Sequence, residues 1–269
     1  MKKQCSVSFV LLLFVYTASS QQKTKWINGL YLQWGYNAEW YTRSTIHFDM
    51  SNGNDFTLHK ARAHNNPGFQ TIIDKPLQIS IPQYNYRLGF YLNKRHTKAA
   101  EINFDHAKYI VTNGQKVHVT GQIDDKTVNG DSILNPATFL HFEHTDGANW
   151  LHFNYVQQQV LATTTKKERP LLTWIWKAGA GINIPRTDFT WRGERLNNKF
   201  HVSGYNFAGE SGLRLYPLKR FFLELTGKTG YVKYVNALAD TPSEKGNRAS
   251  HGFGYFEIIG TFGFDINWK

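Results

Sequence analysis

Cysteine is almost absent from this 269-residue sequence: the one cysteine, Cys5, lies near the N-terminus. Lys2 and Lys3 precede an apolar run there, and small residues end the segment before Gln21. These are the features of a secretory signal peptide, so we expect residues 1–20 to be removed on export. An exported chain without disulfides has to be held together by a large core or by a closed sheet.

Long apolar runs are also missing. Beyond the expected signal peptide no segment approaches 18 consecutive apolar residues, which excludes a transmembrane helix. The mean hydropathy of −0.47 does not exclude a transmembrane β-barrel, because a barrel places apolar residues at every second position and polar ones between them. The aromatic content of 15%, with eight Trp and fourteen Tyr, suits the aromatic girdles of such barrels.

Several catalytic motifs are absent too. The sequence has no glycine-rich phosphate loop after a strand, no HExxH and no CxxC, so nucleotide and zinc-protease chemistry have no support. We expect no cofactor and no metal ion.

Charge is unbalanced. Removing Lys2 and Lys3 from 31 bases leaves 29 against 20 acids, a formal net charge of +9. The bases cluster in short segments at 93–98, 163–170 and 217–220. They are either solvated turns or contacts for anionic lipid headgroups. An exported chain rarely meets nucleic acid, so we expect no nucleic-acid partner.

Apolar and polar residues alternate over eight segments, each long enough to cross a bilayer as a tilted strand of about 9–11 residues. In the first, Leu32, Trp34 and Trp40 face opposite Gln33 and Glu39. The fourth is the least regular. The segments are 30–41, 83–93, 100–111, 150–162, 171–184, 205–216, 220–231 and 253–269.

Short and long connections alternate between these segments. The short ones are near 95–98, 163–170 and 217–219, and the long ones near 43–77, 113–148, 185–200 and 236–250. Tight turns at one end and long loops at the other are typical of outer-membrane barrels. Strand-like pieces within the long loops, at 55–64 and 116–123, predict hairpins beyond the membrane; inside the barrel they would raise its strand count to ten or twelve.

We expect residues 21–269 to form one domain. A soluble β-sandwich is the chief alternative fold.

The signal peptide, the alternating segments with unequal turns and the aromatic last strand at 255–269 together resemble small bacterial outer-membrane β-barrels, of the outer-membrane protein A/X-like or lipid A deacylase-like kind. This resemblance implies an all-β, antiparallel, up-and-down transmembrane barrel of eight strands in the bacterial outer membrane. It also implies contact with outer-membrane lipids, including lipopolysaccharide, and with other envelope proteins. The barrel-assembly machinery would recognise the last strand, where Trp268 is penultimate and Lys269 departs from the usual aromatic end.

Charged residues recur on the faces that would point into the barrel, seven acids and four bases. Because an eight-stranded barrel has room inside for little more than side chains, we expect these charges to pair in a packed interior. The residues of this predicted interior network are Glu39, Arg87, Glu101, Asp105, Lys177, Glu210, Arg214, Glu224, Lys228, Glu257 and Asp265.

A histidine-rich stretch at 141–152 offers the densest candidate chemistry, and Asp105 with His106 would lie near it on the neighbouring strand. The candidate catalytic residues are therefore His144, Asp146, His106 and Asp105. Three interpretations compete: a lipid acyl hydrolase, for which a serine nucleophile is missing; a metal site, which strand alternation opposes; and a polar turn at the membrane rim.

The function predicted from these patterns is that of a structural or interaction protein of the cell envelope with a packed, charged barrel interior. The alternatives are an outer-membrane lipid A-modifying acyl hydrolase and a narrow transport or ligand-binding barrel.

Overall fold

The computed structural model describes residues 27–74, 82–165 and 169–266. The predicted signal peptide (1–20) lies outside the described residues, and so do Trp268 and Lys269 at the end of the predicted last strand.

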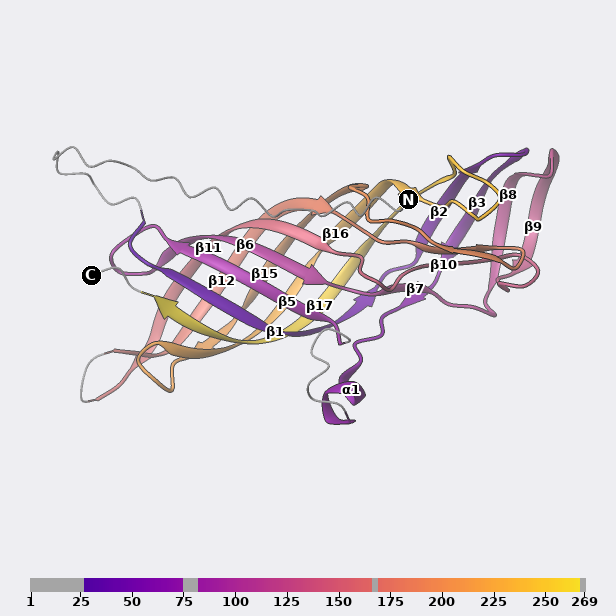
Figure 1. Ribbon diagram of the computed structural model, residues 1–269. Helices are drawn as coiled ribbons and strands as arrows, with labels where there is room; N and C mark the ends of the chain where they lie inside the picture. The colour runs from indigo at the N-terminus through magenta and orange to yellow at the C-terminus, as the bar shows by residue number, and fades with distance from the viewer. Residues whose placement is uncertain (1–26, 75–81, 166–168, 267–269) are drawn as a thin grey trace, which may run out of the picture.

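Eight antiparallel strands form a closed ring, the barrel at the left of Figure 1. Each pairs with the next along the chain, and the last pairs with the first, Leu30 opposite Ile266 through Tyr41 opposite Tyr255. The predicted eight-stranded antiparallel barrel is therefore confirmed. Its strands are β1 (Leu30–Tyr41), β5 (Tyr84–Tyr91), β6 (Lys98–His106), β11 (Trp150–Thr163), β12 (Pro170–Asn183), β15 (Gly204–Leu215), β16 (Phe221–Leu238) and β17 (Arg248–Ile266).

One edge of β17 serves two partners. Its residues 255–266 pair with β1 and close the barrel, whereas residues 248–252 pair with β2 (Ser44–Met50). From β2 the sheet continues through β3 (Asn54–Ala61) and β8 (Lys116–Ile123) to β9 (Lys126–Ile133). The strand-like pieces of the long loops thus extend the sheet beyond the ring, in agreement with the predicted hairpins. The ring keeps eight strands.

A second sheet of five short strands lies beside this extension: β14 (Glu194–Asn197), β13 (Asp188–Trp191), β10 (Leu140–His144), β7 (Tyr109–Val111) and β4 (Ala63–His64), in that order. The predicted single strand 100–111 is wrong at this point, because β6 ends at His106 and β7 belongs to the second sheet. We call β2, β3, β8, β9 and the second sheet together the head (right side of Figure 1).

A short helix, α1 (Phe69–Asp74), follows β4. No helix in the described part of the chain is long and apolar enough to cross a membrane.

The barrel wall has reversed polarity. Along β17 the apolar Phe256, Phe262 and Phe264 are 47%, 45% and 51% exposed on the outside, while Glu257 and Asp265 between them are 0% and 7% exposed. A soluble sandwich would bury the phenylalanines and expose the acids. An apolar outer wall around a charged interior is the arrangement of a barrel that faces lipid.

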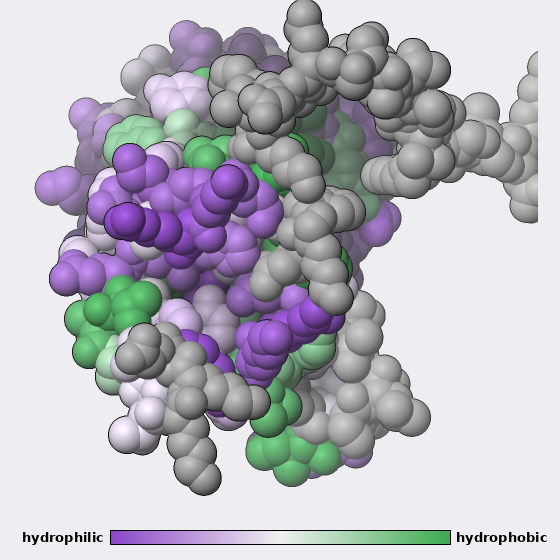
Figure 2. Space-filling model, turned by 90° about the vertical axis from the view of Figure 1, so that its left-hand side faces the viewer, coloured by the Kyte–Doolittle hydropathy of each residue, from purple (hydrophilic) through white to green (hydrophobic). Residues whose placement is uncertain are grey.

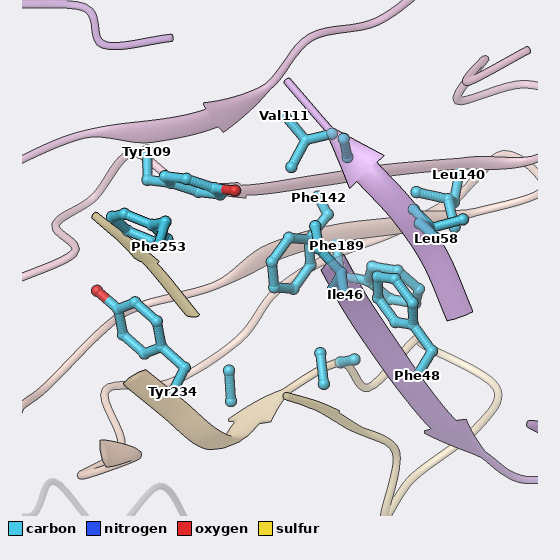
Figure 3. Close-up of a cluster of buried hydrophobic side chains, with 14 of the residues drawn as sticks. Ile46, Phe48, Leu58, Tyr109, Val111, Leu140, Phe142, Phe189, Tyr234 and Phe253 are labelled. Atoms are coloured by element: carbon cyan, nitrogen blue, oxygen red, sulfur yellow. The ribbon is translucent and has the colours of Figure 1, made fainter. Parts of the chain in front are cut away.

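The head has a hydrophobic core of its own, shown in Figure 3. Alternate residues of β2 and β3 point toward the second sheet, as the period of two in a strand requires. The ring of Phe48 lies 5.3 Å from Phe142 and 5.5 Å from Phe189, and Phe56 lies 5.4 Å from Trp191. The long connections therefore fold into a packed two-sheet unit.

Tight turns hold the hairpins of the head in register. The β8–β9 turn is Asp124–Asp125, with φ of 53° and 60°, and the β13–β14 turn is Arg192–Gly193, with φ of 49° and 88°. Two successive residues in the left-handed region are the mark of a type I′ turn, whose twist matches that of the paired strands.

We predict that Phe48→Ala will loosen the head and leave the barrel intact. Removing this ring from three aromatic contacts should cost about 3–5 kcal/mol, and limited proteolysis should then cut the head. The barrel should still migrate on unheated gels as a compact species.

Thr57→Ala, on the solvent side of the same hairpin, is the matched control. The two-part description is wrong if Phe48→Ala leaves the head resistant to protease, or if it also abolishes the compact gel species.

Candidate functional site

Every residue of the predicted interior network lies inside the barrel. The eleven charged side chains come from seven of the eight strands of the ring, all but β11, and each of these residues is at most 7% exposed. Period-two alternation explains their placement, because each follows or precedes an outward-facing residue.

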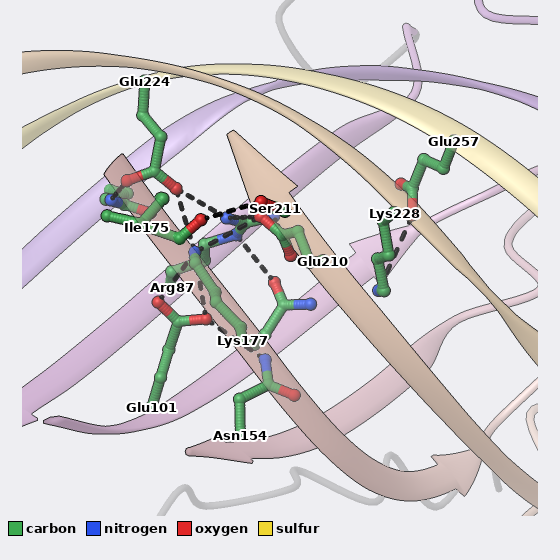
Figure 4. Close-up of polar contacts among 12 residues, drawn as sticks. Arg87, Glu101, Asn154, Ile175, Lys177, Glu210, Ser211, Glu224, Lys228 and Glu257 are labelled. Carbon is green, nitrogen blue, oxygen red and sulfur yellow. Dashed lines mark hydrogen bonds and ion pairs between the residues drawn. The ribbon is translucent and has the colours of Figure 1, made fainter. Parts of the chain in front are cut away.

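Glu224 is the centre of the larger group of ion pairs (Figure 4). Its carboxylate lies 2.6 Å from Arg214, 2.9 Å from Lys177 and 3.0 Å from Arg87. Glu210 completes the group, at 2.7 Å from Arg87 and 3.4 Å from Lys177. Three cations thus share two carboxylates, which come from adjacent strands, β15 and β16.

A second group lies closer to the head. Lys228 forms an ion pair with Asp105, and its Nζ is 3.6 Å from Glu257 and 3.1 Å from Nε2 of His152. One lysine therefore serves two carboxylates in this group.

Neutral donors hold the acids that lack enough cations. Asn37 Nδ2 donates to Glu39 and to Glu257, at 2.7 Å each. The Tyr31 hydroxyl donates to Glu101 at 2.6 Å, where Lys177 also binds at 3.1 Å. Hydrogen bonds to a buried carboxylate offset part of its desolvation cost.

Aromatic rings seal the end of the barrel that lies away from the head. The Arg214 guanidinium sits 4.0 Å from the ring centre of Phe222 and 4.8 Å from that of Tyr31. Gly89 is required here, because a Cβ at that position would overlap the Tyr31 ring. The interior is thus filled by paired charges and stacked rings.

The four candidate catalytic residues do not converge. Asp105 is in the barrel interior with Lys228. His106 stacks on Tyr84 with ring centres 4.5 Å apart, and its Nδ1 contacts Asn149 at 2.9 Å.

The other two candidates lie in the head and its connections. His144 is fully buried in the head, whereas Asp146 is exposed and pairs with Arg186 at 3.1 Å. None of the four side chains is placed beside a serine on the outer wall.

A buried chain of polar side chains in the head was not foreseen. Ser44 Oγ lies 3.3 Å from Nδ1 of His251, whose Nε2 lies 3.3 Å from Nε2 of His144, and Nδ1 of His144 lies 3.2 Å from Thr187 Oγ1. All four residues are at most 1% exposed. This chain has a Ser–His contact but no surface for a substrate, so it cross-links the head.

The two histidines of this chain are held neutral. Burial lowers the pKa of His144 to about 3. Burial, helped by the neighbouring His144, also lowers the pKa of His251 well below its ordinary value. Sequence spacing could not reveal the pair, because the two residues are 107 positions apart.

Metal chemistry finds no support in the described ranges, where no group of three or more His, Cys, Asp or Glu side chains could hold an ion.

We predict that Arg87→Met will lower the free energy of unfolding by about 3–5 kcal/mol, because it leaves Glu210 and Glu224 short of a buried partner. Urea unfolding in detergent, followed by tryptophan fluorescence, measures this loss. Arg192→Met removes an exposed pair with Asp124 and should cost far less, because solvent screens that pair. Equal losses in the two variants would contradict a paired interior.

We predict that acid will loosen the head. Above pH of about 6.5 both histidines are neutral in the folded and unfolded states. Below it the unfolded chain binds protons that folded His144 and His251 refuse, so stability should fall by about 1.4 kcal/mol per pH unit for each histidine. Limited proteolysis between pH 7.5 and 4.5 measures this slope.

His144→Gln should roughly halve that slope, and His118→Gln on the surface should leave it unchanged. If the pH dependence of stability is the same in His144→Gln as in the wild type, the buried histidines are not its cause.

No family model matches the chain, and no curated protein matches it. Among solved structures it is similar to Neisserial surface protein A (7% identity, 87% of this chain and 96% of that one, TM-score 0.38). It is also similar to OprG from Pseudomonas aeruginosa (9%, 90% and 98%, 0.42) and to Ail of Yersinia pestis (9%, 88% and 99%, 0.34). These likenesses concern the fold alone. With its closed ring, apolar wall and charged interior, the chain has the fold of a small outer-membrane β-barrel protein.

Proposed function

We propose that this protein is an integral protein of the bacterial outer membrane that displays a rigid head outside the cell and conducts nothing through its barrel. The observation that carries the proposal is that the same chain has a filled barrel interior and a folded head. It acts as a structural or interaction protein of the envelope.

The filled interior argues against transport. Glu224, Arg87 and Lys177 cross the middle of the barrel from three different strands and meet within 3.0 Å. Arg214, Lys228 and Trp150 are each at most 1% exposed, which leaves them no contact with a water-filled channel. A ring of eight strands is just wide enough for such a filling.

The head supplies a surface for recognition. The face of β2, β3 and β8 that points away from the head core is polar and ordered by hydrogen bonds. His47 meets Asp55 at 2.7 Å, and His59 Nε2 meets Thr120 at 2.7 Å. Binding residues are concentrated on connections that a rigid scaffold positions. We infer that this face contacts another molecule of the cell surface.

The outer wall supplies the contact with lipid. A groove of about 650 Å³ on it is lined by apolar side chains such as Leu32, Trp34 and Phe262. Acyl chains of outer-membrane lipids, including lipopolysaccharide, would fill such a groove. Pairing of β17 with β1 makes the last strand the closing element, which fits recognition of that strand by the barrel-assembly machinery.

A lipid acyl hydrolase is less well supported. It would need a nucleophile and a base within hydrogen-bond reach of each other on a surface that lipid can reach. Within the described residues the Ser–His contact that we find, Ser44 with His251, is buried in the head.

We predict that the purified protein will give no stepwise currents in planar bilayers and will not release small dyes from proteoliposomes, because paired side chains fill its interior. A general porin serves as the positive control for both assays. Reproducible current steps from the wild-type chain would contradict the proposal and favour a transport barrel.

The enzymatic alternative is tested on the same preparation. Mass spectrometry of lipid A from cells with and without the gene should give the same acyl pattern, whereas loss of one acyl chain in the presence of the gene would establish a hydrolase.

A further inference from the structure

A pocket opens at the end of the barrel away from the head. It has a volume of about 260 Å³, and its lining combines residues of the three turns that join β5 to β6, β11 to β12 and β15 to β16 with strand residues such as Gln158 and Asp265. Figure 2 looks onto this end and shows strongly hydrophilic surface gathered across it, beside apolar wall residues.

The lining is cationic. Lys94, Arg95, Arg169 and Lys219 contribute four permanent positive charges, drawn from all three turns. Of the acids among the described residues, Asp265 lines the pocket, and its carboxylate already accepts the Tyr91 hydroxyl at 2.7 Å. The pocket therefore has a surplus of positive charge.

Three of these cations lack a partner in the part of the chain that the structure describes. Lys94, Arg95 and Lys219 make no hydrogen bond or ion pair with any described residue. Some exposed cations elsewhere in the molecule are paired, as Arg192 is with Asp124 and Lys116 with Asp131. Like charges brought close together repel each other, so an anion bound between them would stabilise this arrangement.

The rest of the lining is held in position. Arg169 donates from both terminal nitrogens to the carbonyls of Tyr216 and Pro217, at 3.1 Å each. His96 stacks on Tyr91 with ring centres 4.0 Å apart, and its Nε2 contacts the Asn28 carbonyl at 3.1 Å. These contacts hold Arg169 against the β15–β16 turn and His96 against Tyr91 of β5, so this part of the lining is preformed.

We propose that this pocket binds a phosphate group. Guanidinium and ammonium donors that approach from several sides match the oxygens of a phosphate, which several hydrogen bonds can satisfy at once. A water molecule's share of liquid volume is about 30 Å³, so 260 Å³ holds a phosphate with water around it. If the barrel lies in the outer membrane as proposed above, this end meets the inner-leaflet headgroups, and the phosphate belongs to an anionic phospholipid or to a soluble phosphate compound.

The test compares three forms of the full-length protein in detergent: the wild type, K94Q/R95Q/K219Q, and a head variant K60Q/K126Q/K199Q that loses the same charge at the opposite end. Native mass spectrometry counts dioleoylphosphatidylglycerol molecules retained from mixed micelles with phosphatidylcholine. Calorimetric titration with inorganic phosphate at low salt measures soluble phosphate. Gel migration without heating checks that each variant folds.

We expect the wild type and the head variant to bind alike and the pocket variant to bind at least tenfold more weakly. Retention of phosphatidylglycerol that the pocket variant loses identifies a lipid headgroup as the source. Phosphate binding without lipid retention identifies a soluble compound. R169Q, which keeps Lys94, Arg95 and Lys219, should weaken binding less than the triple substitution.

Binding by neither probe, or equal loss in the pocket and head variants, overturns the proposal. Either result leaves the display function of the head untouched, because that function depends on the interior and on the other end of the barrel.

Discussion

The pairing of charges inside a ring too narrow for a water channel is the interaction on which the rest of the molecule depends. A carboxylate removed from water costs several kcal/mol unless cations and hydrogen-bond donors surround it. Glu224 has three cations within 3.0 Å, and Glu39 relies on neutral amide donors. Since the three cations come from β5, β12 and β15 and Glu224 comes from β16, these contacts fix how the strands are staggered. The barrel is therefore rigid as well as closed.

That rigidity passes to the head through β16 and β17, which run beyond the ring. Residues 255–266 of β17 close the barrel against β1, and residues 248–252 begin the head sheet against β2. A single strand thus belongs to both units, without a flexible linker between them. The aromatic core around Phe48 and the buried contact between His144 and His251 then hold the two head sheets together. The surface that the head presents is consequently as fixed as the barrel that carries it.

The ring, its strand number and the direction of its faces could be predicted from the sequence. In a long strand, the alternation of apolar and polar residues indicates which side chains face inward. Arg87 and Glu257 were assigned to the interior in this way. Of the head, the strand-like pieces at 55–64 and 116–123 were predicted, but the second sheet was not, since strands such as β7 and β4 have three and two residues and carry no measurable period. The contact between His144 and His251 joins β10 to the head end of β17, two segments that sequence spacing does not relate. The anion pocket was visible in part: the basic turns stood out in the sequence, but their convergence depends on closure of the ring.

The central claim is that the interior charges act as one coupled network. A double-mutant cycle on Arg214 and Glu224, with Arg214→Met, Glu224→Gln and the double variant unfolded in detergent, tests it most directly. The two groups lie 2.6 Å apart and both are buried. The account predicts a coupling energy of about 1–3 kcal/mol, in the range found for groups in one network. Additive losses, with a coupling energy near zero, would contradict it.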